Sequence, residues 1–389
     1  MTAPRTRTRT AAFALGTAAA LLVAAPAYWA VAAPGEDGTA DTAGEVIDVA
    51  SPQEAAIAAD ATAVRLAAAD IVDVPVSFTV VNQNRTLAEC PVDGGTYRIE
   101  GHLTAPRALL EDGTVAGVTL YQHGIAAGEW YWRLDAEGYH HAEEMALRGH
   151  ASVTVDRLGY GASDHPDGYL TCIGGEADIA HQITRALREG TYTVADGDPY
   201  AFDRVYLAGQ SNGGQISQIA AYSFQDIDGL VIMDWTDLGL TPQANARFFT
   251  ALNTCLNGAG GEGGEGDGYV YYDLGTEEFR DGNFHDTDPE VLRLALPHQN
   301  PHPCGDMVAQ LGGVLVDLRH LSEITVPVLF LYGEKDARVE GGAEHRALFT
   351  GTDDTELLEV PEAGHYMGLE RGAPLVHDAL ADWLDRVSG

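Results

Sequence analysis

Gly209-Gln210-Ser211-Asn212-Gly213-Gly214 lies between a short apolar run at 205–208 and a segment with helical character at 215–222. A G-x-S-x-G pattern between a strand and a helix is typical of a sharp turn that lifts a serine hydroxyl above the edge of a sheet. The glycines on both sides of the serine leave room where strand and helix nearly touch. The pattern therefore predicts a strained strand–turn–helix unit with Ser211 at its tip.

Further apolar runs lie on both sides of this unit and alternate with helical segments. Strands are expected at 76–81, 97–104, 117–122, 151–156, 204–208, 230–234, 326–332 and 356–360, with helices at 140–149, 176–189 and 375–387. Strands that alternate with helices are typical of parallel βαβ units. The chain is therefore expected to be an α/β protein with an open, mostly parallel, doubly wound sheet.

The alternation stops after the sixth expected strand. Residues 236–322 contain two cysteines, several aromatic side chains and a glycine-rich acidic run at 258–268. A segment of this length is too long for a simple loop, so we expect an inserted lid or cap. The expected sheet domain is thus divided into a first part at 75–235 and a second part at 323–389.

The N-terminus has the features of a secretory signal. Arg5, Arg7 and Arg9 precede an apolar run at 11–25, and residues 30–32 read Ala-Val-Ala, a small-residue cleavage site. We expect a signal peptide at 1–32, a linker with an Ala-rich helix at 33–74, and a secreted, extracellular mature protein. The alternative is a membrane anchor formed by an uncleaved signal, because residues 11–33 carry no charge.

Export would place the four cysteines in an oxidising compartment. They are Cys90, Cys172, Cys255 and Cys304. An even number of cysteines in an oxidising compartment is typical of disulfides, and four cysteines allow three pairings. We favour Cys90–Cys172 in the sheet domain and Cys255–Cys304 across the insertion.

The composition excludes some partners. A formal net charge of −36 argues against binding to nucleic acid and to anionic membrane surfaces. The plain explanation of this charge is solubility. We expect a small-molecule partner and, once the signal is cleaved, no stable association with a membrane.

Four motifs together resemble the α/β-hydrolase superfamily, from residue 76 to the C-terminus. They are His123-Gly124, Asp156-x-x-Gly-x-Gly, the turn around Ser211, and an acid followed by a histidine, in the order that the family uses. The resemblance is to a secreted bacterial serine esterase or lipase. It implies that Ser211 is the nucleophile, that Asp336 is the acid and that His365 is the base. Asp234 and Glu334 are the alternatives for the acid.

In such a site His365 takes the serine proton and Asp336 orients the imidazole. The family also implies an oxyanion hole made by the backbone N–H groups of Ile125 and Asn212. No cofactor and no metal site are expected. The implied reaction is hydrolysis of a carboxylic ester. Alternatives with the same triad are an aminopeptidase, an amidase or a lactonase, and less readily an acyltransferase or a binding module without activity.

Aromatic side chains predict the kind of substrate. Trp130 and Trp132 follow the expected oxyanion loop closely, and Phe248 and Phe249 belong to the insertion. We expect these four to bind an apolar or aromatic substrate. The alternative is that they only pack the lid against the sheet domain.

Overall fold

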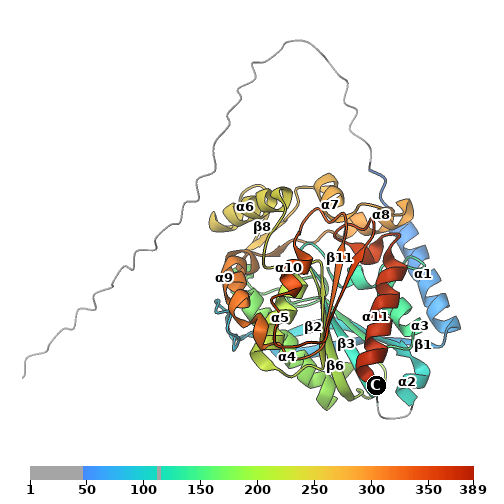
Figure 1. Cartoon of the computed structure of the whole chain (residues 1–389). Helices are drawn as coiled ribbons and strands as arrows, with labels where there is room; N and C mark the ends of the chain where they lie inside the picture. The colour runs from blue at the N-terminus through green and yellow to red at the C-terminus, as the bar shows by residue number, and fades with distance from the viewer. Residues whose placement is uncertain (1–46, 112–114) are drawn as a thin grey trace, which may run out of the picture. The chain divides into compact units, whose positions relative to one another are not determined.

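A nine-stranded sheet lies at the centre of the computed structural model, which describes residues 47–111 and 115–389 (Figure 1). The expected signal peptide and most of the linker lie outside the described residues. The strand order is β12-β11-β7-β6-β3-β4-β2-β1-β5. The strands are β1 (Ile71–Val81), β2 (Thr96–Pro106), β3 (Val115–Gln122), β4 (Ser152–Val155), β5 (Thr193–Val194), β6 (Phe202–Gln210), β7 (Gly229–Met233), β11 (Val328–Gly333) and β12 (Thr355–Val360).

The strands from β12 to β4 run parallel to one another, and β2, β1 and β5 extend the sheet with antiparallel pairs. The expected open and mostly parallel sheet is therefore confirmed. Two details differ from the prediction. β1 begins at Ile71, so the domain boundary expected between residues 74 and 75 falls inside this strand. The two-residue strand β5 was not predicted, because two residues carry no detectable alternation.

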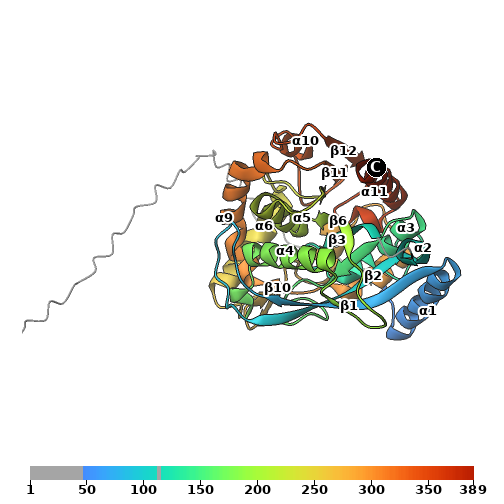
Figure 2. The ribbon, with the colours of Figure 1, turned by 90° about the horizontal axis from the view of Figure 1, so that it is seen from below.

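Helices cover both faces of the sheet (Figure 2). One face holds α4 (Ile173–Glu189) and α5 (Asn212–Phe224), and the other holds α3 (His141–Leu147) and α11 (Ala373–Ser388). The side chains of β6 belong to two hydrophobic cores, one on each face of the sheet. Val205 and Leu207 pack in the core with α4 and α5, whereas Tyr206 and Ala208 pack in the core with α11. Alternate residues of a strand point to opposite faces, so a buried strand is apolar throughout.

The expected Ala-rich helix is α1 (Pro52–Ala68), which begins with the capping box of Ser51 and Glu54. It is tied to α3 by an ion pair between Arg65 and Glu143, with 2.9 Å between Nη2 and Oε2. α2 (Arg107–Glu111) is a short helix after β2. No helix of the described residues is long and apolar enough to cross a membrane.

Between β7 and β11 the chain forms a cap, defined here as the elements from α6 to α9. Its helices are α6 (Pro242–Leu256), α7 (Thr276–Asn283), α8 (Pro289–Ala295) and α9 (Cys304–His320). A small sheet of β8 (Gly264–Gly266), β9 (Tyr269–Val270) and β10 (His302–Pro303) joins them. The cap has its own buried cluster, which includes Phe248, Tyr272 and Met307.

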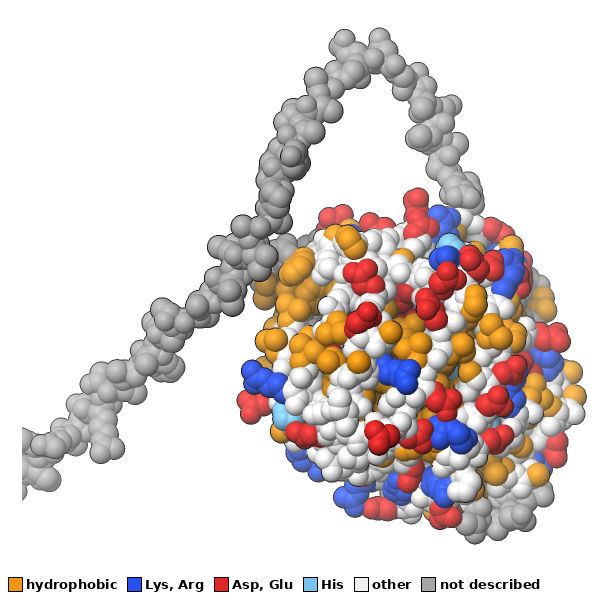
Figure 3. All heavy atoms as spheres, in the orientation of Figure 1, with side chains coloured by type: hydrophobic (Ala, Val, Ile, Leu, Met, Phe, Trp, Pro, Cys, Tyr) orange, Lys and Arg blue, Asp and Glu red, His pale blue; other side chains and the backbone are white. Residues whose placement is uncertain are grey.

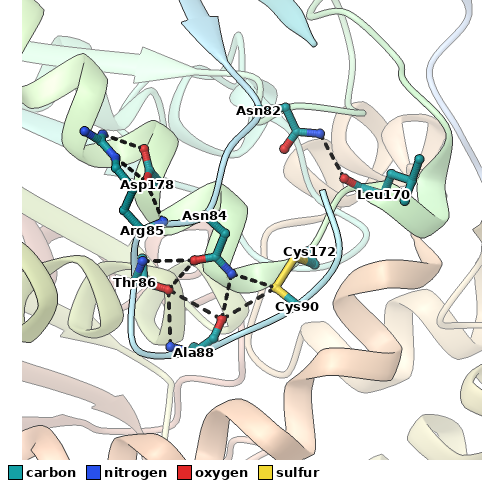
Figure 4. The surroundings of a disulfide bond; sticks show 9 residues. All are labelled: Asn82, Asn84, Arg85, Thr86, Ala88, Cys90, Leu170, Cys172 and Asp178. Carbon is teal, nitrogen blue, oxygen red and sulfur yellow. Dashed lines mark hydrogen bonds and ion pairs between the residues drawn. A yellow bond between two sulfur atoms is a disulfide. The ribbon is translucent and has the colours of Figure 1, made fainter. Parts of the chain in front are cut away.

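Both favoured disulfide pairings are confirmed. Cys255–Cys304 joins the end of α6 to the start of α9. Cys90–Cys172 fastens the loop after β1 to the start of α4 (Figure 4). Near this second bond Asn84 donates to the Ala88 carbonyl and accepts from the Thr86 hydroxyl, so the loop is also held by its own side chains.

Charged side chains are scattered over the face of the molecule that Figure 3 draws. On the face drawn in Figure 3, acidic and basic side chains lie intermixed with apolar ones. The large negative charge of the chain therefore forms no single acidic patch on this face, as expected if the charge serves solubility.

Candidate active site

Ser211 stands at the turn between β6 and α5 with φ 54° and ψ −127°. This backbone conformation is strained for a residue with a side chain. Its N–H donates to the Met233 carbonyl over 2.7 Å, which ties the turn to β7. A Cβ on Gly209 would lie 2.1 Å from the Gly213 oxygen, and a Cβ on Gly213 would lie 2.2 Å from the Gln122 oxygen. Both positions therefore require glycine, as the sequence pattern predicts.

His365 lies in the loop after β12, and its side chain is only 4% exposed. Its Nδ1 is 2.8 Å from Oδ2 of Asp336, which follows β11. The other carboxylate oxygen of Asp336 accepts from the N–H groups of Arg338, at 2.6 Å, and Val339, at 3.2 Å. The structure thus pairs His365 with Asp336 and fixes the carboxylate with backbone donors.

The two alternative acids make other contacts. Asp234 accepts from the Gly333 N–H over 2.9 Å and so supports the start of the acid loop. Burial raises the pKa of Asp234 well above its ordinary value, and the neighbouring Asp336 raises it further. Glu334 is exposed and pairs with Lys335. Asp336 is therefore the carboxylate that contacts the histidine.

Asp234, Asp336 and His365 are also the one described group whose carboxylate and imidazole atoms converge closely enough to hold a metal, within 4.8 Å of one another. Oδ1 of Asp234, both carboxylate oxygens of Asp336 and Nδ1 of His365 take part in hydrogen bonds, whereas Oδ2 of Asp234 has no partner in the described part of the chain. The arrangement matches an acid–histidine pair better than an open coordination site.

The expected oxyanion loop lies against the serine. A Cβ on Gly124 would be 2.8 Å from the Ser211 Cβ, so the two backbones approach closely. His123 holds this loop: its Nε2 accepts from the Arg157 N–H over 3.0 Å, and its Nδ1 lies 2.9 Å from the Gly124 carbonyl. Burial lowers the pKa of His123 well below its ordinary value, so the ring is neutral and its Nδ1–H donates to that carbonyl. Ile125 follows directly.

Ser211, His365 and Ile125 open onto one cavity beneath the cap. The volume that it offers to the centre of a water molecule is about 40 Å³, enough for about three waters. Asn212 is fully buried at the first position of α5, beside Ser211. The cavity is lined by Ile125, Ser211, Trp235, Leu240, Tyr272, Asp273, Asn283, Gln310, Arg338, Val339 and His365.

The four aromatic residues expected to bind substrate lie elsewhere, and none of them is among the described residues that line this cavity. Trp130 stacks on His298, with ring centroids 5.7 Å apart, at a separate hollow of the surface. Trp132 is buried in the core against Tyr121. Phe248 is buried inside the cap, and Phe249 is 57% exposed on α6. None of the four lines the cavity that Ser211 shares with His365, and their role in binding substrate stays a prediction.

Sequence reasoning missed the polar residues of the cavity. Arg338 pairs with Asp273 of the cap, with 2.5 Å between Nη2 and Oδ1. Burial raises the pKa of Asp273, and the attraction of Arg338 opposes that rise. The one available signal was that Arg338 follows the acid Asp336 by two positions. Asp273, sixty-five residues away in the cap, carried no signal.

Solved structures resemble the chain in fold, and a family profile matches its sequence. A search of curated proteins finds no match. Among solved structures, a thermophilic esterase from Thermogutta terrifontis (malate bound) is 20% identical, with TM-score 0.56, over 80% of this chain and 100% of that one. A monoacylglycerol lipase of Paleococcus ferrophilus is 16% identical, with TM-score 0.53, over 69% and 94%. A hydrolase from Pseudomonas aeruginosa PA01 is 19% identical, with TM-score 0.53, over 74% and 94%.

These three likenesses concern the fold alone. The sequence profile described as the alpha/beta hydrolase family matches residues 122–379, which is more than half of the chain and includes His123, Ser211 and His365. With this match, and with the sheet order and the serine turn described above, the chain belongs to the alpha/beta hydrolase family.

Proposed function

We propose that this protein is a serine hydrolase that cleaves carboxylic esters through an acyl-enzyme on Ser211. The observation that carries the proposal is the shared cavity. Ser211 on its strained turn and His365, paired with Asp336 over 2.8 Å, line the same small space. Ser211, His365 and Asp336 come from three separate loops, and a nucleophile, a base and an orienting acid in these roles would activate the serine hydroxyl.

In the first half-reaction the Ser211 Oγ attacks the ester carbonyl carbon and its proton passes to Nε2 of His365. The carbon–oxygen bond to the alcohol then breaks, and His365 returns the proton to the leaving oxygen. Water attacks the acyl-enzyme with the same base and releases the acid and free Ser211. Asp336 holds the imidazole with Nδ1 protonated, because Nδ1 faces its carboxylate.

The negative charge of each tetrahedral intermediate needs donors that are already in place. We assign them to the N–H groups of Ile125 and Asn212. The close approach of Gly124 to Ser211 supports this assignment, since it puts the next residue beside the reacting oxygen. One such donor contributes about 3 kcal/mol to lowering the barrier. The structural hydrogen bonds of His123 keep the loop in position.

We also propose that the protein is exported and matures by removal of residues 1–32. The support is that all four cysteines are paired in disulfides, which persist in oxidising compartments. The mass of the protein recovered from the medium tests this: loss of the signal gives a mature chain that begins near Ala33. An intact N-terminus in the membrane fraction would favour the anchor instead.

Labelling with a fluorophosphonate tests the activity directly. The wild type is expected to react at Ser211, Ser211→Ala is expected not to react, and the wild type should hydrolyse short esters. A folded wild type that neither reacts nor hydrolyses any ester would refute the proposal. Amide, lactone and alcohol-acceptor assays on the same sample separate esterase from amidase, lactonase and acyltransferase, which share this triad.

A further inference from the structure

One wall of the catalytic cavity carries the guanidinium of Arg338. This residue is 4% exposed and lines the same space as Ser211 and His365. Its backbone N–H donates to Asp336, so its position is fixed relative to the triad. A buried guanidinium beside a reacting serine is expensive unless its donors have partners.

The cap holds this guanidinium in place. Nη2 of Arg338 pairs with Asp273 over 2.5 Å, and the guanidinium carbon lies 5.2 Å from the centre of the Tyr272 ring. A Cβ on Gly282 of α7 would lie 1.7 Å from Nη2. The glycine therefore leaves the space that the guanidinium occupies. Three contacts from the cap, two of them from adjacent residues after β9, hold one side chain.

Two polar atoms of the cavity residues are left over. Nη1 of Arg338 is buried and has no hydrogen-bond partner within the described part of the chain. Oε1 of Gln310 on α9 is likewise buried and unpartnered among residues 47–111 and 115–389. One atom is a donor and the other is an acceptor. A hydroxyl group can accept from the first and donate to the second.

Charge limits the choice of ligand. Asp273 already balances the positive charge of Arg338, and Asp336 adds a carboxylate nearby. An anionic substrate would meet a cavity wall with no net positive charge. A neutral oxygen gains the hydrogen bond without being repelled by the carboxylates of Asp273 and Asp336. The small volume of the cavity, about 40 Å³ for the centre of a water molecule, favours a short chain.

We propose that Arg338 and Gln310 bind a hydroxyl group of the substrate, and that this protein selects small esters with a hydroxyl close to the scissile carbonyl. This inference rests on the proposed esterase function and replaces the apolar or aromatic substrate that the sequence indicated. Arg338 and Gln310 then determine specificity, while Ser211, His365 and Asp336 perform the chemistry.

Four ethyl-type esters test the selectivity, with acid release followed by a pH indicator: ethyl butanoate, ethyl 3-hydroxybutanoate, 2-hydroxyethyl butanoate and monoethyl succinate. For the wild type we expect kcat/KM to be on the order of tenfold higher for a hydroxyl-bearing ester than for ethyl butanoate. The second and third esters tell whether the hydroxyl belongs to the acyl or the alcohol side. Monoethyl succinate tests a carboxylate in its place, and a preference for it would overturn the proposal.

The variants separate recognition from folding. Arg338→Met alone leaves Asp273 buried without its partner, so the Arg338→Met/Asp273→Asn double variant removes both charges together. In this variant the ratio of kcat/KM for the hydroxy ester to kcat/KM for ethyl butanoate is expected to fall to about one. Gln310→Leu should reduce the same ratio. Arg247→Met is the matched control, because Arg247 pairs with Glu278 and donates to the Tyr272 carbonyl without lining the cavity.

A wild-type ratio near one for both hydroxy esters, or an unchanged ratio in the double variant, would overturn the inference. Fluorophosphonate labelling of Ser211 tells which proposal has failed. If Ser211 reacts and ethyl butanoate is cleaved without any preference, only the hydroxyl selectivity is wrong. If Ser211 does not react and no ester is cleaved, both proposals are wrong.

Discussion

Replacing Gly213 with alanine is a sharp test of how the serine turn is built. An added Cβ would lie 2.2 Å from the Gln122 oxygen and 2.7 Å from the His123 oxygen. Both are backbone atoms at the end of β3, so no side chain can rotate away. Because a Cβ essentially never lies closer than 3.0 Å to another heavy atom, α5 and the end of β3 must separate by about 1 Å.

That separation acts on rate and on stability. The chain that must move leads directly into Gly124 and Ile125, the proposed oxyanion loop. A displacement of about 1 Å at a catalytic group costs about 100-fold in rate, and complete loss of one oxyanion donor costs about 100- to 1,000-fold. We therefore expect Gly213→Ala to lower kcat about 100-fold. Overpacking of this kind also lowers the free energy of unfolding by about 1–3 kcal/mol.

The assay measures kcat and KM on a short ester, together with urea unfolding. Gly312→Ala is the matched control: Gly312 is an exposed position inside α9 where a Cβ meets nothing within 4 Å. This control should keep full activity and gain up to about 1 kcal/mol from helix propensity. A Gly213→Ala protein with a kcat within threefold of wild type would refute the reasoning, since the clash would then have been absorbed without moving the loop.

Three further outcomes are expected. Asp336→Asn should lower kcat by about 10⁴, whereas Asp234→Asn should stay within about tenfold, because His365 contacts Asp336 and Asp234 accepts from the Gly333 N–H instead; the reverse order in ester kinetics would make Asp234 the acid. Replacing Cys255 and Cys304 with alanine should lower the free energy of unfolding by about 4 kcal/mol, because the disulfide closes a loop with a separation of 49 residues. Urea titration measures this, and an unchanged urea midpoint would contradict it. Burial lowers the pKa of His377 to about 3. Below about pH 6.5 the unfolded chain therefore takes up a proton that the folded chain excludes. The free energy of unfolding then falls by about 1.4 kcal/mol for each unit by which the pH is lowered. His377→Phe should remove one proton from that slope between about pH 6 and about pH 4, and equal slopes would show that His377 titrates normally.

The fold could be predicted from local patterns because each pattern has a local cause. Apolar runs become buried parallel strands, and the glycines beside Ser211 are required by backbone atoms closer than 2.5 Å. The pairing of His365 with Asp336 also agrees with the order of the motifs. These features depend on residues near one another in sequence, or on the regular order of strands in a parallel sheet.

The substrate side of the site could not be predicted in this way. Trp130 and Trp132 are near the proposed oxyanion loop in sequence, but Ala126 has φ 63° and the chain turns there before a short 3₁₀ helix at Glu129–Trp132. Trp132 then points into the core. Arg338 and Asp273 come from segments that only the fold of the cap brings together. Sequence proximity indicates neither side-chain direction nor which segments share a cavity.

The cap supports the proposed triad through the loop that holds Asp336. Both backbone donors to Asp336 come from Arg338 and Val339, and both of these residues are attached to the cap side of the molecule. Arg338 is held by Asp273, and Val339 forms an isolated antiparallel bridge with Leu240, just before α6. A shift of the cap would therefore move the donors that orient Asp336. The contacts that shape the cavity and those that hold Asp336 beside His365 lie in one short loop, so the proposed substrate selection and the alignment of the proposed triad are physically coupled.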